Sequence, residues 1–231
     1  MSLTSVILKP MQDKQVELDT KKKILGAVMD ISSLKDDPNK VLEVYEQRVQ
    51  SIVVDIDGNP VEKDRKGNVL VAEKIDIQKN HKIPAEDRYY PVFMFTAEGA
   101  NEVSAYILPM FGAGLWDWIS GFIALDQDLN TIKGIAFDHK TETPGLGARI
   151  ASPEVQDRFA GKKIFEAGKL VSVKMVKGEG NKGLGDHEVD GMSGATMTAK
   201  GVNKMLINYL ECYQGFINKK KSESKIALNE E

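Results

Sequence analysis

The sequence lacks the features of membrane-spanning, disulfide-linked or nucleic-acid-binding proteins. No run of about 18 uncharged apolar residues occurs, and the best stretch, Leu115 to Leu125, is too short and contains Asp117. The single cysteine, Cys212, cannot form an internal disulfide. The formal net charge is -3, with 31 basic and 34 acidic residues mixed along the chain, so no positive field is available to bind nucleic acid.

What is present is the composition of a globular protein. The 231 residues, 42% of them apolar, are enough to bury a hydrophobic core. Apolar residues spaced among Lys and Asp predict an amphipathic helix over residues 12–28. Asp37 and Pro38 predict the cap and first position of a second helix. Strands are expected at 51–56 and 69–77, with a turn at Asp57-Gly58.

The middle and the end of the chain complete the expected fold. Strands are predicted at 92–96, 103–108, 116–125, 131–137 and 170–176, and a helix from about Ala199 to Asn218. Short connections favour antiparallel neighbours. We therefore predict an α+β fold, with a central, mostly antiparallel sheet and helices at the N- and C-terminal ends. Residues 1–50 form an N-terminal helical segment, 51–218 a single domain and 219–231 a charged, frayed tail.

Three motifs with familiar chemistry are incomplete. Gly178 to Gly183 matches G-x-G-x-x-G, but acidic residues follow it where a dinucleotide-binding fold requires a helix. His187 has acidic neighbours, yet the other histidines are distant in sequence, so a zinc site has little support. Gly191 to Ala195 fails the last position of a serine nucleophile elbow. A hydrolase built on Ser193 and a distant histidine stays open as an alternative.

Two further segments could hold a ligand. Residues 142–147 form a loop in which Gly145 and Gly147 let backbone N–H groups approach another molecule closely, although an ordinary turn is the simpler interpretation. Residues 190–196 place small residues and Thr196 just before the last helix. A phosphate there is favoured by the helix N-terminus, although Thr196 or Thr198 could simply cap the helix.

These two segments resemble the FMN-binding domain found in the C subunit of the bacterial Na+-translocating NADH:quinone reductase and in the G subunit of the related Rnf complex. The family's flavinylation motif, D-x-x-[ST]-G-A-T, is matched by Asp190, Ser193, Gly194, Ala195 and Thr196. The loop Glu142, Thr143, Pro144, Gly145, Leu146 and Gly147 also matches. Residues 8–10, 12, 19–25 and 112–116 look like the soluble region of the reductase's C subunit, which favours it over the Rnf protein.

The resemblance implies an electron-transfer subunit that carries FMN through a phosphoester to Thr196. A flavin transferase using FAD attaches it, with Asp190 in transferase recognition, and this chain contributes no catalytic residue and binds no metal. Residues expected to contact the cofactor are Ser193, Gly194, Ala195, Trp116, Glu142, Thr143, Gly145, Leu146 and Gly147.

The expected surroundings are those of a membrane redox complex. The partners are the other subunits of the complex, and the domain faces the extracytoplasmic, periplasmic side of the bacterial inner membrane. The family's N-terminal transmembrane helix is expected just before this sequence, with Met1 to Leu3 as a leader. The rival interpretation is a non-redox, membrane-anchored assembly or binding module in which Thr196 only caps a helix.

Overall fold

The computed structural model describes residues 3–227, so Met1 and Ser2, where the leader was expected, lie outside the described residues. Its centre is a five-stranded antiparallel sheet in which each strand pairs with the next one along the chain. The strands are β1 (Val49–Val54), β2 (Tyr90–Phe95), β3 (Ala105–Ala113), β4 (Trp118–Asp126) and β5 (Ile132–His139). The predicted α+β class and the antiparallel central sheet are confirmed.

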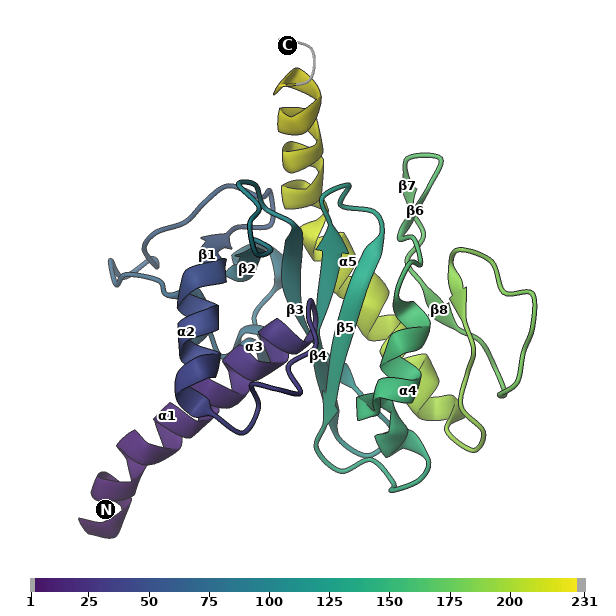
Figure 1. Cartoon of the computed structure of the whole chain (residues 1–231), viewed down its shortest axis with the longest axis horizontal. Coiled ribbons are helices and arrows are strands. Elements are labelled where there is room, and N and C mark those ends of the chain that lie inside the picture. Colours follow the sequence, from purple (N-terminus) through teal and green to yellow (C-terminus); the bar gives the residue numbers. More distant parts are fainter. Residues whose placement is uncertain (1–2, 228–231) are drawn as a thin grey trace.

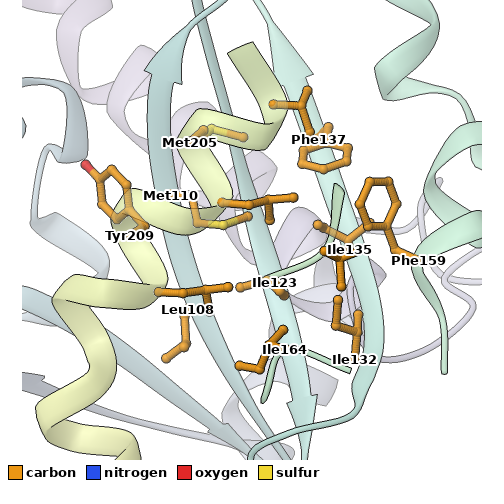
Figure 2. Packing of buried hydrophobic residues seen from close by; sticks show 14 of the residues in the cluster. Leu108, Met110, Ile123, Ile132, Ile135, Phe137, Phe159, Ile164, Met205 and Tyr209 are labelled. Atoms are coloured by element: carbon orange, nitrogen blue, oxygen red, sulfur yellow. The ribbon is translucent and has the colours of Figure 1, made fainter. Parts of the chain in front are cut away.

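Helices cover both faces of this sheet (Figure 1). One face carries α1 (Leu3–Gly26) and α2 (Pro38–Arg48), and the other carries α5 (Thr196–Ala227). Successive strand residues point to opposite faces, so Ile107 joins the core beneath α1 and α2, whereas Leu108 joins the core beneath α5. Figure 2 shows Leu108, Met110 and Ile123 of the sheet packed with Met205 of α5.

The predicted cap of α2 is confirmed. The Asp37 carboxylate accepts the backbone N–H groups of Asn39 at 3.1 Å and Lys40 at 3.4 Å, and Pro38 occupies the first helical position. Helix α1 ends at Gly26, near its predicted end, but begins well before residue 12. None of the helices within residues 3–227 has the length and apolar character that crossing a bilayer requires.

The strand predicted at 69–77 was wrong. Only Val69 forms an isolated bridge, to Lys63, and the chain then makes the 3-10 helix η1 (Ala72–Lys74) and the short helix α3 (Ile77–Asn80). Asp76 caps α3 by accepting the N–H of Lys79 at 3.0 Å. This local side-chain bond competes with strand formation. A second 3-10 helix, η2 (Ala85–Asp87), leads into β2.

The predicted strand at 170–176 is interrupted. Ser172 has φ 61, a left-handed conformation that breaks the strand into β7 (Lys169–Leu170) and β8 (Lys174–Met175). The remaining short elements are η3 (Gly147–Ala151), α4 (Pro153–Gln156), η4 (Asp157–Phe159), β6 (Phe165–Glu166) and β9 (Glu188–Val189). Strand β6 pairs with β7, and β9 runs parallel to β8.

Helix α5 is longer at both ends than predicted. It begins at Thr196 and continues through Ala227, past the expected end at Asn218, so residues 219–227 are helical and were wrongly expected to fray. The C-terminal part of α5 extends beyond the sheet (Figure 1). The division into segments 1–50, 51–218 and 219–231 stays a prediction.

Candidate functional site

Thr196 is the first residue of α5 and is half-buried. The first hydrogen bond of the helix runs from the N–H of Ala199 to the carbonyl of Ala195 at 2.9 Å. Within residues 3–227, the N–H groups of Thr196, Met197 and Thr198 have no hydrogen-bond acceptor. The Thr196 hydroxyl therefore stands at the positive end of a long helix, beside unpaired donors.

The loop of residues 142–147 follows β5 and is a tight turn. The N–H groups of Leu146 and Ala148 both donate to the carbonyl of Thr143, each at 3.1 Å. Gly145 has φ 74 and no neighbour within 4 Å of the position that a Cβ would take. The turn thus leaves an open stretch of backbone at its tip.

The two motif segments meet in space. Gly194 has φ 73, and a Cβ there would stand 2.8 Å from Cδ2 of Leu146. Two residues past Thr196, the hydroxyl of Thr198 donates to Oε2 of Glu142 at 2.5 Å. The loop of residues 142–147 therefore packs directly against the segment of residues 190–196, although they are distant in the chain.

Trp116 joins the same site from the connection between β3 and β4. Its indole Nε1–H donates to Oγ1 of Thr143 at 3.3 Å. Its side chain is 70% exposed. Three other large apolar side chains, from the same connection, the loop of residues 142–147 and the first turn of α5, are also exposed: Leu115 (46%), Leu146 (40%) and Met197 (53%). We call these four residues the apolar rim. Exposed apolar side chains that gather at one place indicate a contact surface.

Glu142 is the buried member of the site, with only 4% of its surface exposed. Its Oε1 accepts the backbone N–H groups of Leu115 at 2.7 Å and Trp116 at 3.3 Å, while its Oε2 accepts the hydroxyl of Thr198. Both carboxylate oxygens thus have protein donors.

Asp190 also has several donors. Its carboxylate accepts the N–H of Gly180 at 2.8 Å, both the backbone and side-chain N–H of Asn181 at 3.0 and 2.9 Å, and its neighbour Gly191 at 3.1 Å. Burial opposes ionisation, but the bonds from Gly180 and Asn181 outweigh it and lower the pKa of the carboxyl. Asp190 therefore ties the glycine-rich loop to the segment before Thr196, and its expected part in transferase recognition stays a prediction.

An ion-pair network supports that segment from the other side. Glu179 pairs with Arg149 at 2.5 Å and Arg158 at 3.1 Å, and also accepts the N–H of Ser193 at 3.2 Å. The bond from Arg149, then Ser193 and Arg158, lowers the pKa of Glu179 from 4.5 to about 2. Arg158 further donates to the carbonyl oxygen of Asp190 at 3.2 Å. The chain around Ser193 is thus held in place by charge-assisted bonds.

A cavity of about 260 Å³ opens beside Thr196. Its lining comes from α5, from β8 with the residues after it, and from Met192: Met175, Val176, Lys177, Gly178, Met192, Thr196, Ala199 and Lys200. A larger cavity of about 1110 Å³ is lined by α1, α2, residues 71–79 and the sheet, and none of the residues of the two motifs lines it.

Among the residues that the structure describes, no hydrogen bond joins a serine to a histidine. His187 contacts the carbonyl of Lys163 at 2.7 Å, and His81 contacts the hydroxyl of Tyr209 at 3.1 Å. Across the part of the chain that the structure describes, Ser193 has no hydrogen bond to a histidine. A hydrolase mechanism therefore gains no support from the geometry.

Comparison with known proteins matches this region to a flavin family. Residues 114–211 match the FMN-binding domain. The C subunit of the Na(+)-translocating NADH-quinone reductase of Haemophilus ducreyi is 35% identical over 211 residues, which cover 86% of this chain and 78% of the relative. The same protein of Neisseria meningitidis serogroup A is 33% identical, with coverage of 93% and 85%. This chain belongs to the family of these C subunits.

Solved structures of the same family agree with this assignment. The crystal structure of the Na(+)-translocating NADH-quinone reductase C subunit from Parabacteroides distasonis has a TM-score of 0.76 and 35% identity, covering 94% of this chain and 98% of that one. The Shewanella oneidensis NqrC structure has a TM-score of 0.74 and 25% identity, covering 90% and 99%. The predicted resemblance is confirmed, for fold as well as sequence.

The residues predicted for the site do come together, but they differ in how far they are exposed. Trp116, Thr143, Leu146 and Thr196 are at least partly exposed around the start of α5, whereas Glu142 faces inward. Sequence reasoning considered Thr198 only as a helix cap, missing its bond to Glu142, and gave Glu179 no role in the site. The signal for Thr198 was its place in the first turn of the helix, and Glu179 was considered only as a variable position of G-x-G-x-x-G.

Proposed function

We propose that this chain is an electron-transfer subunit of a membrane-bound, Na+-pumping NADH:quinone oxidoreductase and carries FMN through a phosphoester to Thr196. The observation that carries the proposal is the packing of the loop of residues 142–147 against the segment of residues 190–196, within the region that matches the FMN-binding domain. Curated relatives and structural neighbours bear the name of the reductase's C subunit, which favours it over the Rnf protein.

The residues around Thr196 fit a phosphate. The N–H groups of Met197 and Thr198, which have no acceptor among residues 3–227, lie in the same helical turn, and the helix dipole stabilises a negative group there by roughly 0.3 to 1 kcal/mol. Lys177 and Lys200 line the adjoining cavity. Their charges favour a phosphoester further.

The apolar rim fits an aromatic ring system. Trp116 and Leu146 offer exposed apolar surface on the side of the loop, and Met197 offers it on the helix. The indole of Trp116 is oriented by the hydroxyl of Thr143, and the backbone beyond Gly145 is open. Rigid aromatic and aliphatic surface with a few polar groups is typical of cofactor sites. Bound FMN would supply the redox chemistry, while these residues hold and orient it.

The modification itself uses FAD and a separate flavin transferase. The Oγ of Thr196 forms a bond to the phosphorus of the FMN half, the bond from that phosphorus to the bridging oxygen breaks, AMP leaves, and the hydroxyl proton is released. Thr196 is half-buried at the start of α5, so part of this residue is exposed to such an enzyme. This chain is the substrate of that reaction and supplies no catalytic residue.

In the complex, the domain exchanges electrons with the cofactors of neighbouring subunits. We place it on the extracytoplasmic side of the bacterial inner membrane, beside those subunits, as the family resemblance implies. No acid, base or nucleophile of this chain is required, because the protein's contribution is attachment, orientation and exclusion of solvent.

The deciding measurement is the intact mass of the domain after co-expression with a flavin transferase. We expect a gain of one FMN less one water, retained in Thr196→Ser and absent in Thr196→Ala. Ser33→Ala is the control, since this exposed hydroxyl lies outside both motif segments, and it should keep the gain. The absence of a gain in the parent, with a transferase proven active on another substrate, would favour the non-redox module and leave Thr196 as a helix residue only.

A further inference from the structure

Glu142 connects separate segments of the site from its buried side. It is almost fully buried, and its three donors belong to two other segments, the β3–β4 connection and the first turn of α5. We propose that Glu142 is a positioning residue that fixes Trp116 relative to the helix of Thr196 and acts on the flavin only through them. This inference rests on the proposed function and assigns Glu142 a role other than cofactor contact.

The space around the carboxylate is shaped for it. A Cβ at Gly114 would overlap Oε1 of Glu142, and a Cβ at Gly147 would overlap Oε2 and the hydroxyl oxygen of Thr198. Both glycines therefore leave volume that the carboxylate fills. A buried carboxylate whose oxygens accept several donors fixes the geometry of every segment that supplies one.

Two neighbouring residues hold two different N–H groups of Trp116. Glu142 accepts its backbone N–H, and Thr143 accepts its indole N–H. The other oxygen of Glu142 holds Thr198, two residues past Thr196. One side chain therefore links the residue best placed against an aromatic ring to the residue that carries the phosphoester.

The substitutions can separate positioning from simple support of the fold. Glu142→Gln keeps the length: its amide oxygen accepts from Leu115 and Trp116, and its NH2 donates to the hydroxyl of Thr198. Glu142→Ala removes all three contacts. Thr198→Val keeps Glu142 and removes only the link to α5, and Thr143→Val removes only the indole bond.

The first measurement uses the unmodified domain in a Trp118→Phe background, where Trp116 is the sole tryptophan. We expect the fluorescence anisotropy of Trp116 to fall in Glu142→Ala and to return to the parent value in Glu142→Gln. The second measurement uses the flavinylated domain without the Trp118 change. We expect its visible circular dichroism and reduction potential to shift in Glu142→Ala and Thr198→Val, with Glu142→Gln closer to the parent.

A purely structural role gives a different result. In that case Glu142→Ala lowers the urea midpoint, but the anisotropy of Trp116 and the reduction potential of the folded protein equal those of the parent, which overturns the proposal. If Glu142→Ala does not fold, the reduction potential of flavinylated Thr198→Val decides it: a shift from the parent supports the proposal, and the parent value overturns it. Failure of the proposed function is distinguishable, because the parent then gains no FMN mass while the anisotropy test on the unmodified domain still applies.

Discussion

At the scale of single residues, two glycines with nearly the same backbone have different surroundings. Gly194 has φ 73 and Gly145 has φ 74, so alanine at either position is strained by roughly 1 to 2 kcal/mol. Only at Gly194 does the added Cβ meet a neighbour, Leu146. In urea unfolding, we expect Gly194→Ala to lose roughly 1 kcal/mol more of the free energy of unfolding than Gly145→Ala loses.

The double variant checks the cause. Shortening the neighbour with Leu146→Ala should remove the clash, so Gly194→Ala with Leu146→Ala should be more stable than the sum of the single changes predicts. Equal losses for Gly194→Ala and Gly145→Ala would show that the two motif segments do not pack as described.

Glu179 gives the site a pH dependence. Its pKa falls from 4.5 to about 2 through its bonds with Arg149, Ser193 and Arg158. A lowered carboxyl pKa contributes stability that is fully present above pH 4.5 and is lost as the pH falls toward 2. We expect Glu179→Gln to lower the melting temperature at pH 7, and the difference from the parent to shrink below pH 4.5.

The control for this prediction is Glu188→Gln. Glu188 is exposed on β9, and its side chain has no ion-pair partner among the described residues 3–227. The melting temperature of Glu188→Gln should equal that of the parent at every pH. A constant difference for Glu179→Gln down to pH 3 would contradict the ion-pair network.

At the scale of elements, the cap of α2 is the clearest case of a boundary set by one side chain. Asp37 accepts two backbone N–H groups at the start of the helix. We expect Asp37→Ala to reduce the free energy of unfolding by about 0.5 to 2 kcal/mol, measured in urea. The neighbouring Asp36→Ala, at an exposed position outside the helix, should change it by less than about 0.5 kcal/mol.

The elements that could be predicted from sequence are those whose cause is local. The four middle strands, which are separated by turn residues, and the Asp37-Pro38 signal are both readable in the chain, and both were confirmed. The strand predicted at 69–77 was wrong because Asp76 bonds to Lys79 instead. Ser172 interrupts another predicted strand because its φ is positive, and a positive φ could not be predicted from a serine in the sequence.

At the scale of the whole molecule, the sheet separates two cores. Ile24 of α1 is fully buried in the core beneath α1 and α2, away from α5. We expect Ile24→Ala to cost about 2 to 5 kcal/mol in urea unfolding, because a cavity forms in a packed interior. The folded fraction should still gain the mass of FMN, whereas the control Val16→Ala, at an exposed position of α1, should change neither quantity.

Loss of the FMN gain in folded Ile24→Ala would show that the sheet transmits disturbance from one face to the other.

The candidate site was predictable as two motifs and a tryptophan, but the contacts among its residues were not. That Glu142 faces inward to Thr198 depends on how α5 docks, which is a property of the assembled fold and not of either segment.

The order of the site's segments along the chain bears on synthesis. The partners of Glu142 lie 26 and 27 residues before it and 56 residues after it. The five strands of the sheet precede α5 along the chain, so a ribosome delivers them before that helix. The threonine at the start of α5 therefore joins its surroundings only after the sheet, the loop and the tryptophan have been made, and a chain stopped before α5 contains the loop and the tryptophan but no acceptor hydroxyl.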